Sequence, residues 1–368
     1  MIRGPLHDAH VAAGARMVDF AGWDMPLQVS GVVAEHTAVR ERVGLFDVSH
    51  LGKVLVTGPD AGALVDMVVT GAVSGLEVGR ARYGLCLTPE GGIVDDLFVY
   101  RRAADFLVVP NAANTKAVQA CLADSRAAGG FDAEITEAAF QWAILALQGP
   151  RARAMAEELL PGAVELKLHR FREIALDGVA LQVARTGYTG EYGFELFVPW
   201  DDAPRIWDRL LAAGAPHGIL PIGLGARDTL RLEMGYPLHG HEISVDHNPV
   251  EAGLSWAVAW DKPAFTGRDA IVGVREAGPS RRLVGLQASG PGIPRAGQHV
   301  LSGSRQVGEL TSGNFSPTLK TGIGLGYVHP EAAEPGTMLD IDVRGKQVPA
   351  TVVVPPFVAR GRAAAAGS

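Results

Sequence analysis

Length, composition and charge narrow the classes of protein to which this chain can belong. It has 368 residues, enough for two or three domains with a substantial core, and 47% of them are hydrophobic. The formal net charge is −7 and no basic stripe follows the chain, so nucleic acid is not an expected partner. Residues 1–8 lack the apolar segment of a signal peptide, and no apolar run approaches the roughly 20 residues that cross a bilayer. We therefore expect a cytoplasmic protein with no membrane partner.

In chain order, the first predicted elements alternate between strands and helices. The pattern predicts a strand and an irregular turn at 15–29, a helix at 32–43 and a strand at 53–57. A second group follows, with a helix at 60–69 capped by Asp60, strands at 81–88, 93–100 and 106–109, and a helix at 112–127. This second group predicts a small α+β lobe inserted into the body at about 51–134.

The strand predicted at 93–100 contains two adjacent carboxylates, Asp95 and Asp96. Neighbours on a strand point to opposite faces, so only Asp96 shares the face of Tyr100. At least one carboxylate therefore lies among apolar side chains, where burial raises its pKa and suits it to proton transfer. A strand end whose carboxylates face water or cap a turn is the alternative.

The middle of the chain offers groups that suit a flat, polar ligand. A buried strand at 142–147, a helix at 151–160 and hairpin strands within 171–199 are predicted there. Tyr188 lies among glycines and can stack on a flat ring, and Glu195 can accept two parallel hydrogen bonds from an amidine-like edge. An ordinary glycine-rich hairpin with an exposed glutamate is the alternative. Asn111 and Asn114 are either helix caps or amide contacts to a heterocycle.

The next helical pattern, after a helix predicted at 204–213, places Arg227 and Arg231 one turn apart on one face. A solvated, salt-bridged face explains this pattern as well as a ligand site does. The glycines of 223–228 lack the third glycine of the dinucleotide fingerprint, so a nicotinamide cofactor is not predicted. Residues 249–260 are predicted to be strand-like and 265–276 to be a helix.

Several local patterns resemble reactive centres without fitting them. Cys86 and Cys121 form no Cys-x-x-Cys motif, so neither a disulfide framework nor a zinc site is predicted. Ser49 and His50 are adjacent on a strand-like segment and face apart, and no Gly-x-Ser-x-Gly elbow exists, which argues against a serine hydrolase. The segment 239–247 gathers histidine and acidic residues at spacings that match no common metal site, so a polar loop is favoured and no metal is predicted.

From residue 281 onward the pattern changes to short strands separated by turns. They are predicted at 283–287, 300–301, 307–311, 324–329, 338–343 and 348–354. Such spacing is typical of a small β-barrel, so we predict a body at 1–279 and a barrel domain at 280–368. The tail at 360–368 is expected to be frayed.

Seven motifs, in order along almost the whole chain, carry a family resemblance. They are Met-Val-Asp-Phe-Ala-Gly-Trp at 17–23, Gly-x-Phe-Asp-x-Ser-His at 44–50, Gly-Gly-Ile-Val-Asp-Asp-Leu at 91–97, Leu-Gln-Gly-Pro at 147–150, Thr-Gly-Tyr-Thr-Gly-Glu at 186–191, Gly-Ala-Arg-Asp-Thr-Leu-Arg-Leu-Glu at 225–233 and Thr-Ser-Gly-Asn-Phe-Ser-Pro at 311–317. Together they resemble the aminomethyltransferase, or T-protein, family of the glycine cleavage system, within the folate-binding superfamily. The resemblance implies an α+β, multi-lobed folate-binding fold closed by a C-terminal β-barrel domain.

The resemblance also implies an activity and a set of site residues. Such enzymes transfer the methylene carbon of the aminomethyl group on lipoylated H-protein to tetrahydrofolate, releasing ammonia. By the resemblance, the catalytic carboxylate lies in the Asp95–Asp96 pair, and we choose Asp96 because its face carries Tyr100. The residues implied to hold the folate are Leu51, Tyr100, Asn111, Tyr188, Glu195, Arg227 and Tyr236, with Arg360, or alternatively Arg362, reaching the site from the C-terminus.

Some positions depart from the family pattern, and related activities stay open. Leu51 stands where the family often has methionine, and Pro110 interrupts the usual valine run before Asn111. Folate-dependent demethylases of the same superfamily would share the pterin site. A non-catalytic relative in iron–sulfur maintenance is a further alternative, although its Lys-Gly-Cys-x-x-Gly-Gln-Glu signature is absent from the region around 238–249.

Overall fold

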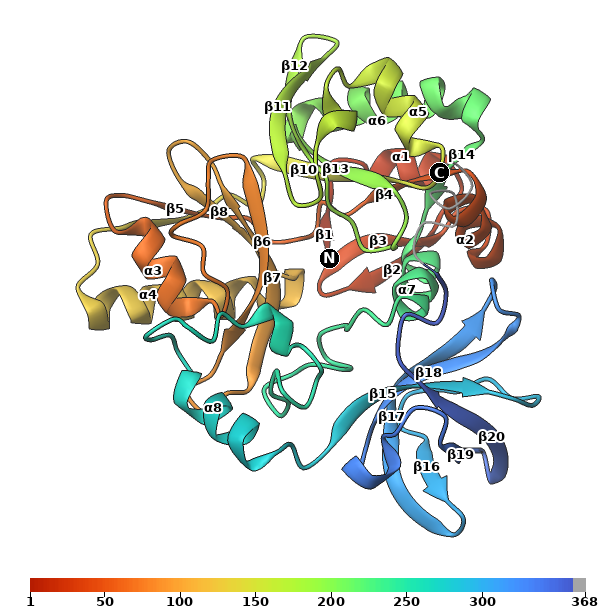
Figure 1. The fold of residues 1–368 in the computed structure, drawn as a ribbon. Coiled ribbons are helices and arrows are strands. Elements are labelled where there is room, and N and C mark those ends of the chain that lie inside the picture. The colour runs from red at the N-terminus through yellow and green to blue at the C-terminus, as the bar shows by residue number, and fades with distance from the viewer. Residues whose placement is uncertain (360–368) are drawn as a thin grey trace.

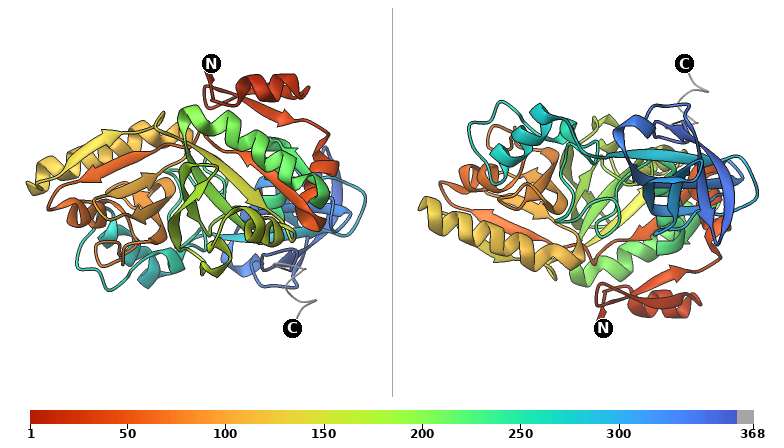
Figure 2. Two further views of the ribbon diagram at one scale, coloured as in Figure 1. Left: turned by 90° about the horizontal axis from the view of Figure 1, so that it is seen from above. Right: turned by 90° about the horizontal axis from the view of Figure 1, so that it is seen from below.

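The computed structural model describes residues 1–359. Their sheets are grouped into three lobes (Figure 1). The tail predicted to fray, 360–368, lies outside the described residues together with Arg360 and Arg362. The two views in Figure 2 show helix α4 (Thr115–Gly129) and the C-terminal barrel at opposite ends of the molecule, with the six-stranded sheet between them. Among residues 1–359 no helix is both long and apolar enough to cross a bilayer.

The central lobe is built on a six-stranded sheet flanked by a small three-stranded one. The six-stranded order is β11 (Phe171–Leu176), β12 (Val179–Ala184), β13 (Gly193–Pro199), β10 (Trp142–Gln148), β4 (Val43–Asp47) and β14 (Ile219–Ile222). The small sheet has the order β1 (Ile2–Arg3), β3 (Trp23–Gln28) and β2 (Arg16–Phe20). The helices of this lobe are α1 (His7–Ala12), α2 (Val32–Glu41), α5 (Ala152–Leu159), α6 (Ala203–Gly214) and α7 (Leu224–Glu233). Helix α1 was missed by the sequence pattern.

The second lobe is a five-stranded sheet with two helices on one face. Its order is β6 (Arg80–Leu87), β7 (Ile93–Arg101), β8 (Phe106–Val109), β5 (Val54–Thr57) and β9 (Glu134–Glu137), and its helices are α3 (Ala61–Val68) and α4. This sheet occupies the chain between β4 and β10, which pair with each other in the central lobe. The predicted limits of the inserted lobe, and of the two domains, stay predictions.

The third lobe is a closed barrel, as the short strands from residue 281 onward predicted. Its strands follow the order β15 (Arg282–Ala288), β18 (Thr321–Val328), β17 (Arg305–Ser316), β16 (His299–Ser302), β19 (Met338–Val343) and β20 (Lys346–Val353). Strand β20 pairs back with β15 and closes the barrel, so no strand edge is left open. Helix α8 (Arg268–Ala277) precedes the barrel in the chain.

The packing of β7 explains how the fold positions its side chains. Leu97 and Val99 on one face are buried in the core formed with α3 and α4. Tyr100, on the other face, is buried in a core between the five-stranded and six-stranded sheets, together with Ala146 and Phe197. The face of β7 that carries Asp96 therefore looks toward the junction of two lobes.

Two local predictions were wrong. Residues 249–260 form turns and a short 3₁₀ helix (Ser255–Ala257), not a strand, and Leu254 and Val258 are buried because they pack into an irregular core beside the barrel. Asp60 precedes α3 but makes no side-chain cap, because its carboxylate accepts a hydrogen bond from the Asp132 backbone N–H at 2.8 Å.

Candidate functional site

Two adjoining hollows lie at the junction of the lobes. The inner one, of about 100 Å³, is lined by Leu51, Tyr83, Asp96, Leu97, Phe98, Tyr100, Val109, Asn111, Ile144, Gly187, Tyr188, Glu195, Phe197, Arg227, Pro237, Leu238 and His239. The outer one, of about 480 Å³, shares Tyr83, Asp96, Phe98, Gly187, Tyr188 and Pro237 with it and adds Leu168, His169, Thr186, Tyr236 and Trp256. Aromatic rings and a few polar groups converge there, as in sites for small organic ligands.

Asp96 lies on the wall that both hollows share. Its Oδ2 accepts a hydrogen bond from the Tyr83 hydroxyl at 3.0 Å, and its Oδ1 accepts one from Asn111 Nδ2 at 2.9 Å. Burial raises the pKa of Asp96 above its ordinary value, although these donors and the His239 charge oppose the shift. The carboxylate is therefore held in one orientation beside the cavity, with a raised proton affinity.

Asp95 points to the opposite face and lines neither hollow. It is fully buried, and it accepts hydrogen bonds from the Asn111 backbone N–H and side chain, both at 2.8 Å, and from Asn114 Nδ2 at 2.7 Å. Burial, and next the charge of Asp96, raise the pKa of Asp95 to about 7. The side chains of the two asparagines thus donate to Asp95 and do not cap α4, which has no side-chain cap at Asn114. Among residues 1–359, only Asn111 donates hydrogen bonds to both carboxylates.

Glu195 provides a second acid on another wall of the inner hollow. Its Oε2 accepts hydrogen bonds from Thr186 Oγ1 at 2.5 Å and from the Tyr100 hydroxyl at 3.4 Å. Burial raises the pKa of Glu195, while Thr186, Arg227 and Tyr100 act in the opposite direction. Both bonds reach Oε2, and no hydrogen bond from the described part of the chain reaches Oε1, so Oε1 is available to a ligand.

Tyr188, Tyr236 and Arg227 form an aromatic and cationic wall. The two tyrosine rings stack at 5.6 Å between centroids, and the Arg227 guanidinium carbon lies 4.4 Å from the Tyr188 ring centre. The Tyr188 hydroxyl donates to the Pro237 carbonyl, which fixes the ring. Among residues 1–359 the Arg227 guanidinium forms no hydrogen bond or ion pair, so its charge stays available to the inner hollow it lines.

Most of the residues singled out in the sequence are brought together, and several others join them. Leu51, Tyr100, Asn111, Tyr188, Glu195 and Arg227 line the inner hollow with Asp96, and Tyr236 lines the outer one. Arg360 lies outside the described residues. Sequence reasoning missed Tyr83 and Trp256, whose rings stack at 5.2 Å. Tyr83 pairs with Phe98 across β6 and β7, so the strand alternation that selected Asp96 could have found it.

Ser49 and His50 do not form a nucleophile and base. The Ser49 hydroxyl oxygen accepts a hydrogen bond from the Ile144 backbone N–H at 3.2 Å. His50 is buried, and burial, followed by the charge of Arg227, lowers its pKa to about 3. Its imidazole is consequently neutral near pH 7, and it packs edge-on against Phe20 at 5.4 Å.

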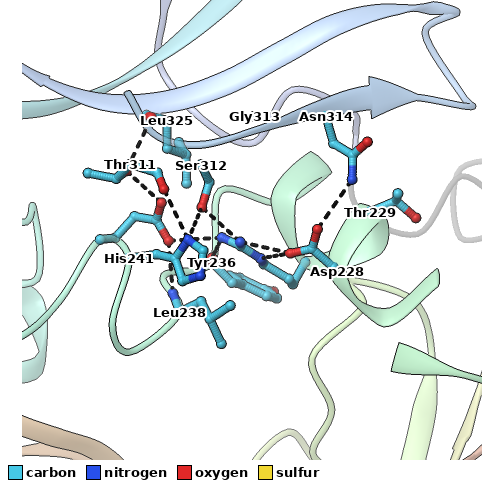
Figure 3. Close-up of polar contacts among 12 residues, drawn as sticks. Asp228, Thr229, Tyr236, Leu238, His241, Thr311, Ser312, Gly313, Asn314 and Leu325 are labelled. Atoms are coloured by element: carbon cyan, nitrogen blue, oxygen red, sulfur yellow. Dashed lines mark hydrogen bonds and ion pairs between the residues drawn. The ribbon is translucent and has the colours of Figure 1, made fainter. Parts of the chain in front are cut away.

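The histidine-rich segment after α7 joins the body to the barrel (Figure 3). Glu242 is fully buried and accepts hydrogen bonds from Arg231 at 2.9 Å and from Thr311 of the barrel at 2.6 Å. His241 Nδ1 lies 3.0 Å from the Thr311 carbonyl oxygen. Within residues 1–359, no three His, Cys, Asp or Glu side chains gather so that they could hold a metal ion.

Two family models together match most of this chain, and curated relatives match nearly all of it. Residues 6–262 match the family model of the GCVT N-terminal domain, and residues 281–359 match that of the glycine cleavage T-protein C-terminal barrel domain. The chain is 48% identical over 362 residues to an aminomethyltransferase of Mycobacterium bovis, which covers 98% of this chain and 97% of that one. An aminomethyltransferase of Frankia alni is 47% identical over 361 residues, or 97% of each chain. The chain belongs to the aminomethyltransferase (T-protein) family.

The fold supports the same assignment. The crystal structure of the glycine cleavage system aminomethyltransferase T from Bartonella henselae matches with a TM-score of 0.90 at 35% identity, covering 98% of this chain and 99% of that one. The predicted family, the α+β fold with its C-terminal barrel and the assignment as an aminomethyltransferase are therefore confirmed. The demethylase and iron–sulfur alternatives are not favoured. Membership of this family supports tetrahydrofolate as substrate and implies an interaction with H-protein.

Proposed function

We propose that this chain transfers the methylene carbon of the aminomethyl group on lipoylated H-protein to tetrahydrofolate, with Asp96 as the group that handles the proton. The proposal rests above all on the Asp96 carboxylate, which is held by Tyr83 and Asn111 on the wall shared by both hollows. A carboxylate with a raised proton affinity, fixed beside a cavity, is suited to accept and return a proton.

The reaction requires two protons to move. The transferred carbon loses its bonds to the ammonia nitrogen and to the lipoyl sulfur, and it gains bonds to two folate nitrogens. Each folate nitrogen gives up one proton; one proton goes to the departing ammonia and the other to the thiol. Asp96 accepts a proton from the attacking folate nitrogen and supplies it to the leaving group. Once it has given up that proton, its negative charge stabilises the cationic carbon.

The remaining polar groups bind and orient the folate. Glu195 keeps Oε1 free for the N–H edge of the pterin, while Thr186 and Tyr100 fix the carboxylate. Arg227 and Tyr188 form the aromatic and cationic wall beside it. Leu51 supplies an apolar contact. In this proposal the folate binds without a metal ion or a nicotinamide.

Binding of the folate is tested by calorimetry with tetrahydrofolate, with and without added divalent metal. Glu195→Ala removes the charged acceptor and should weaken affinity by about 1 to 3 kcal/mol. Transfer is tested with lipoylated, aminomethylated H-protein as donor, measuring ammonia and methylene-tetrahydrofolate together. Absence of binding, binding only with metal, or no turnover with this donor would contradict the proposal.

The contact with H-protein is proposed to be transient, because the lipoyl arm must enter and leave in every cycle. A small, partly polar interface with electrostatic steering suits this exchange. Nucleic acid and membrane have no part in it. The affinity for H-protein should fall as ionic strength rises, and a constant affinity from low to high salt would contradict the electrostatic part.

A further inference from the structure

His239 lines the inner hollow together with Asp96, and the mechanism proposed above gives it no task. Its Nε2 atom is buried and has no hydrogen-bond partner among the described residues. Five side-chain atoms of residues 1–359 are buried in this way, and only that of His239 belongs to a residue that lines either hollow. Because buried polar atoms nearly always have a partner, an imidazole nitrogen without one beside a cavity is suited to contact a ligand.

The fold fastens the segment that carries His239 to the strand that carries Asp96. The Leu238 backbone N–H donates to the buried Glu242 carboxylate at 3.0 Å. The Ile93 N–H, at the first residue of β7, donates to the Ser244 carbonyl at 3.0 Å. The imidazole is therefore held close to the Asp96 carboxylate before any ligand binds, as proton transfer between positioned groups requires.

His239 and Asp96 influence each other electrostatically. The His239 charge acts to lower the pKa of Asp96, against the effect of burial. Burial lowers the pKa of His239, while the Asp96 charge and hydrogen bonds to the backbone of β7 act in the opposite direction. The net shift is downward from 6.5, so the imidazole is neutral near pH 7 and can accept a proton. The other charged side chains that line the inner hollow are Glu195 and Arg227.

We propose that His239 is a second proton-transfer group, which moves the proton of the second folate nitrogen to the lipoyl sulfur. This inference rests on the proposed function. The first folate nitrogen gives its proton through Asp96 to the departing ammonia. The carbon–sulfur bond then breaks, and the second folate nitrogen bonds to the cationic carbon. His239 takes the proton of that nitrogen at Nε2 and gives it to the sulfur, which leaves as a thiol.

The step is balanced and its acid–base order is favourable. One C–S and one N–H bond break, one C–N and one S–H bond form, and the imidazole ends as it began. A folate nitrogen that has bonded to the cationic carbon is positively charged and strongly acidic, so a weakly basic imidazole can take its proton. The lowered pKa of His239 makes the imidazolium a ready donor to a thiolate, since an alkyl thiol has a pKa of about 8.5.

The test follows the two halves of a single turnover separately. Aminomethylated H-protein and tetrahydrofolate are mixed with an excess of the protein and quenched at increasing times. Ammonia reports the first proton transfer, and free lipoyl thiol with methylene-tetrahydrofolate reports the second. The variant is His239→Gln, whose amide can form hydrogen bonds but cannot carry a proton. The control is His241→Gln, which changes a histidine that lies against the Thr311 carbonyl and lines neither hollow.

In His239→Gln, thiol formation should slow by at least about tenfold while ammonia release keeps the wild-type rate. An adduct in which the carbon joins the lipoyl sulfur to one folate nitrogen should then accumulate. Free imidazole added to His239→Ala should restore part of the lost rate, because it can carry the proton from the space that the side chain vacates. His241→Gln should leave both rates unchanged.

A His239→Gln protein in which neither step slows, or in which both slow equally, would overturn this role of His239 and leave the proposed function intact. The same conclusion would follow if imidazole failed to accelerate thiol formation in His239→Ala. Wild-type protein that releases neither ammonia nor thiol from this donor would overturn the proposed function as well. The imidazole experiment decides the proposal even if His239→Gln does not fold.

Discussion

Helix α7 places one arginine beside the cavity and another at the junction with the barrel, and the two differ in their partners. Arg227 and Arg231 lie one turn apart on α7. Arg231 is 2% exposed and donates to Asp228, Glu242 and Ser312, at 2.9, 2.9 and 2.8 Å. Arg227 lines the inner hollow, lies over the Tyr188 ring and, among the described residues, makes no hydrogen bond or ion pair. Acceptors within the protein thus occupy the Arg231 guanidinium, whereas the Arg227 guanidinium has no hydrogen-bond acceptor among the described residues.

The difference separates stability from ligand binding. A buried ion pair whose hydrogen bonds are all made joins two lobes, and its loss leaves an unpaired buried charge. A cation kept without a partner beside a cavity contributes little to folding but can interact with a ligand. The same contrast distinguishes Asp95, held by three N–H donors, from Asp96, which faces the hollows.

Arg231→Met should cause the largest loss of stability. It leaves Glu242 buried without its cation, which costs about 3 to 5 kcal/mol in the free energy of unfolding. Chemical denaturation measures this change. The control is Arg153→Met, which breaks a surface pair with Glu157, 59% and 51% exposed, and should cost no more than about 1 kcal/mol. Adding Glu242→Gln to Arg231→Met should recover part of the loss, and equal losses for Arg231→Met and Arg153→Met would break the comparison.

Asp96→Asn should produce the largest loss of activity. The amide keeps the shape but cannot accept a proton, so turnover should fall by about 10² or more while folate affinity changes little. Rapid-quench measurement of ammonia release, together with calorimetry, checks both parts. An Asp96→Asn variant that retains full turnover would remove Asp96 from the proposed mechanism.

The pH dependence of turnover sharpens this prediction. Burial raises the pKa of Asp96 above the ordinary 3.8, and the proposed role requires the ionised form. Turnover of the wild type should therefore rise as pH increases through this raised pKa, because a protonated Asp96 cannot accept a proton. Asp96→Asn should lose this acidic limb, and an unchanged limb in the variant would assign the titration to another group.

Much of the fold could be predicted because its signals are local. The strand predicted at 93–100 is observed at Ile93–Arg101, and the short strands after residue 281 close into a barrel as their spacing indicated. The apolar residues of 249–260 predict a strand, yet their burial comes from packing against distant elements. Periodicity cannot distinguish a strand from an apolar loop that the rest of the molecule covers.

The site could be predicted in part, for the same physical reason. Strand alternation placed Asp96 with Tyr100, the hydrogen-bonding capacity of a carboxylate singled out Glu195, and a family motif contained Arg227. What the sequence could not show is which polar groups find partners far along the chain. The sequence left Asn111 open between a helix cap and a ligand contact, because its partner Asp95 lies 16 residues away in the chain. Arg231 likewise donates one of its hydrogen bonds to Ser312, a residue of the barrel that lies far along the chain.

Asp95→Asn should affect stability more than chemistry. Its carboxylate accepts three N–H bonds from Asn111 and Asn114, and an amide would turn a donor toward one of these donors. The loss should be about 1 to 3 kcal/mol in unfolding free energy, with turnover largely retained in the folded fraction. Thermal denaturation and transfer rates measured on the same samples separate the two effects. A stable Asp95→Asn protein without turnover would invert the proposed roles of the two carboxylates.

Arg227→Met should have the smallest effect on folding and completes the comparison. Because Arg227 makes no ion pair within residues 1–359, its removal leaves no buried carboxylate without a partner. Its contact with the Tyr188 ring is lost, which is worth about 0.5 to 1 kcal/mol in a partly exposed setting, and so is the charge that lowers the pKa of Glu195. Folate affinity should fall more than stability does, since the free cation is proposed to act on the ligand. Denaturation and calorimetry on Arg227→Met and Arg231→Met measure stability and folate affinity for both arginines. Two equally unstable proteins would mean that both arginines stabilise the fold, and would contradict a separate ligand-binding role for Arg227.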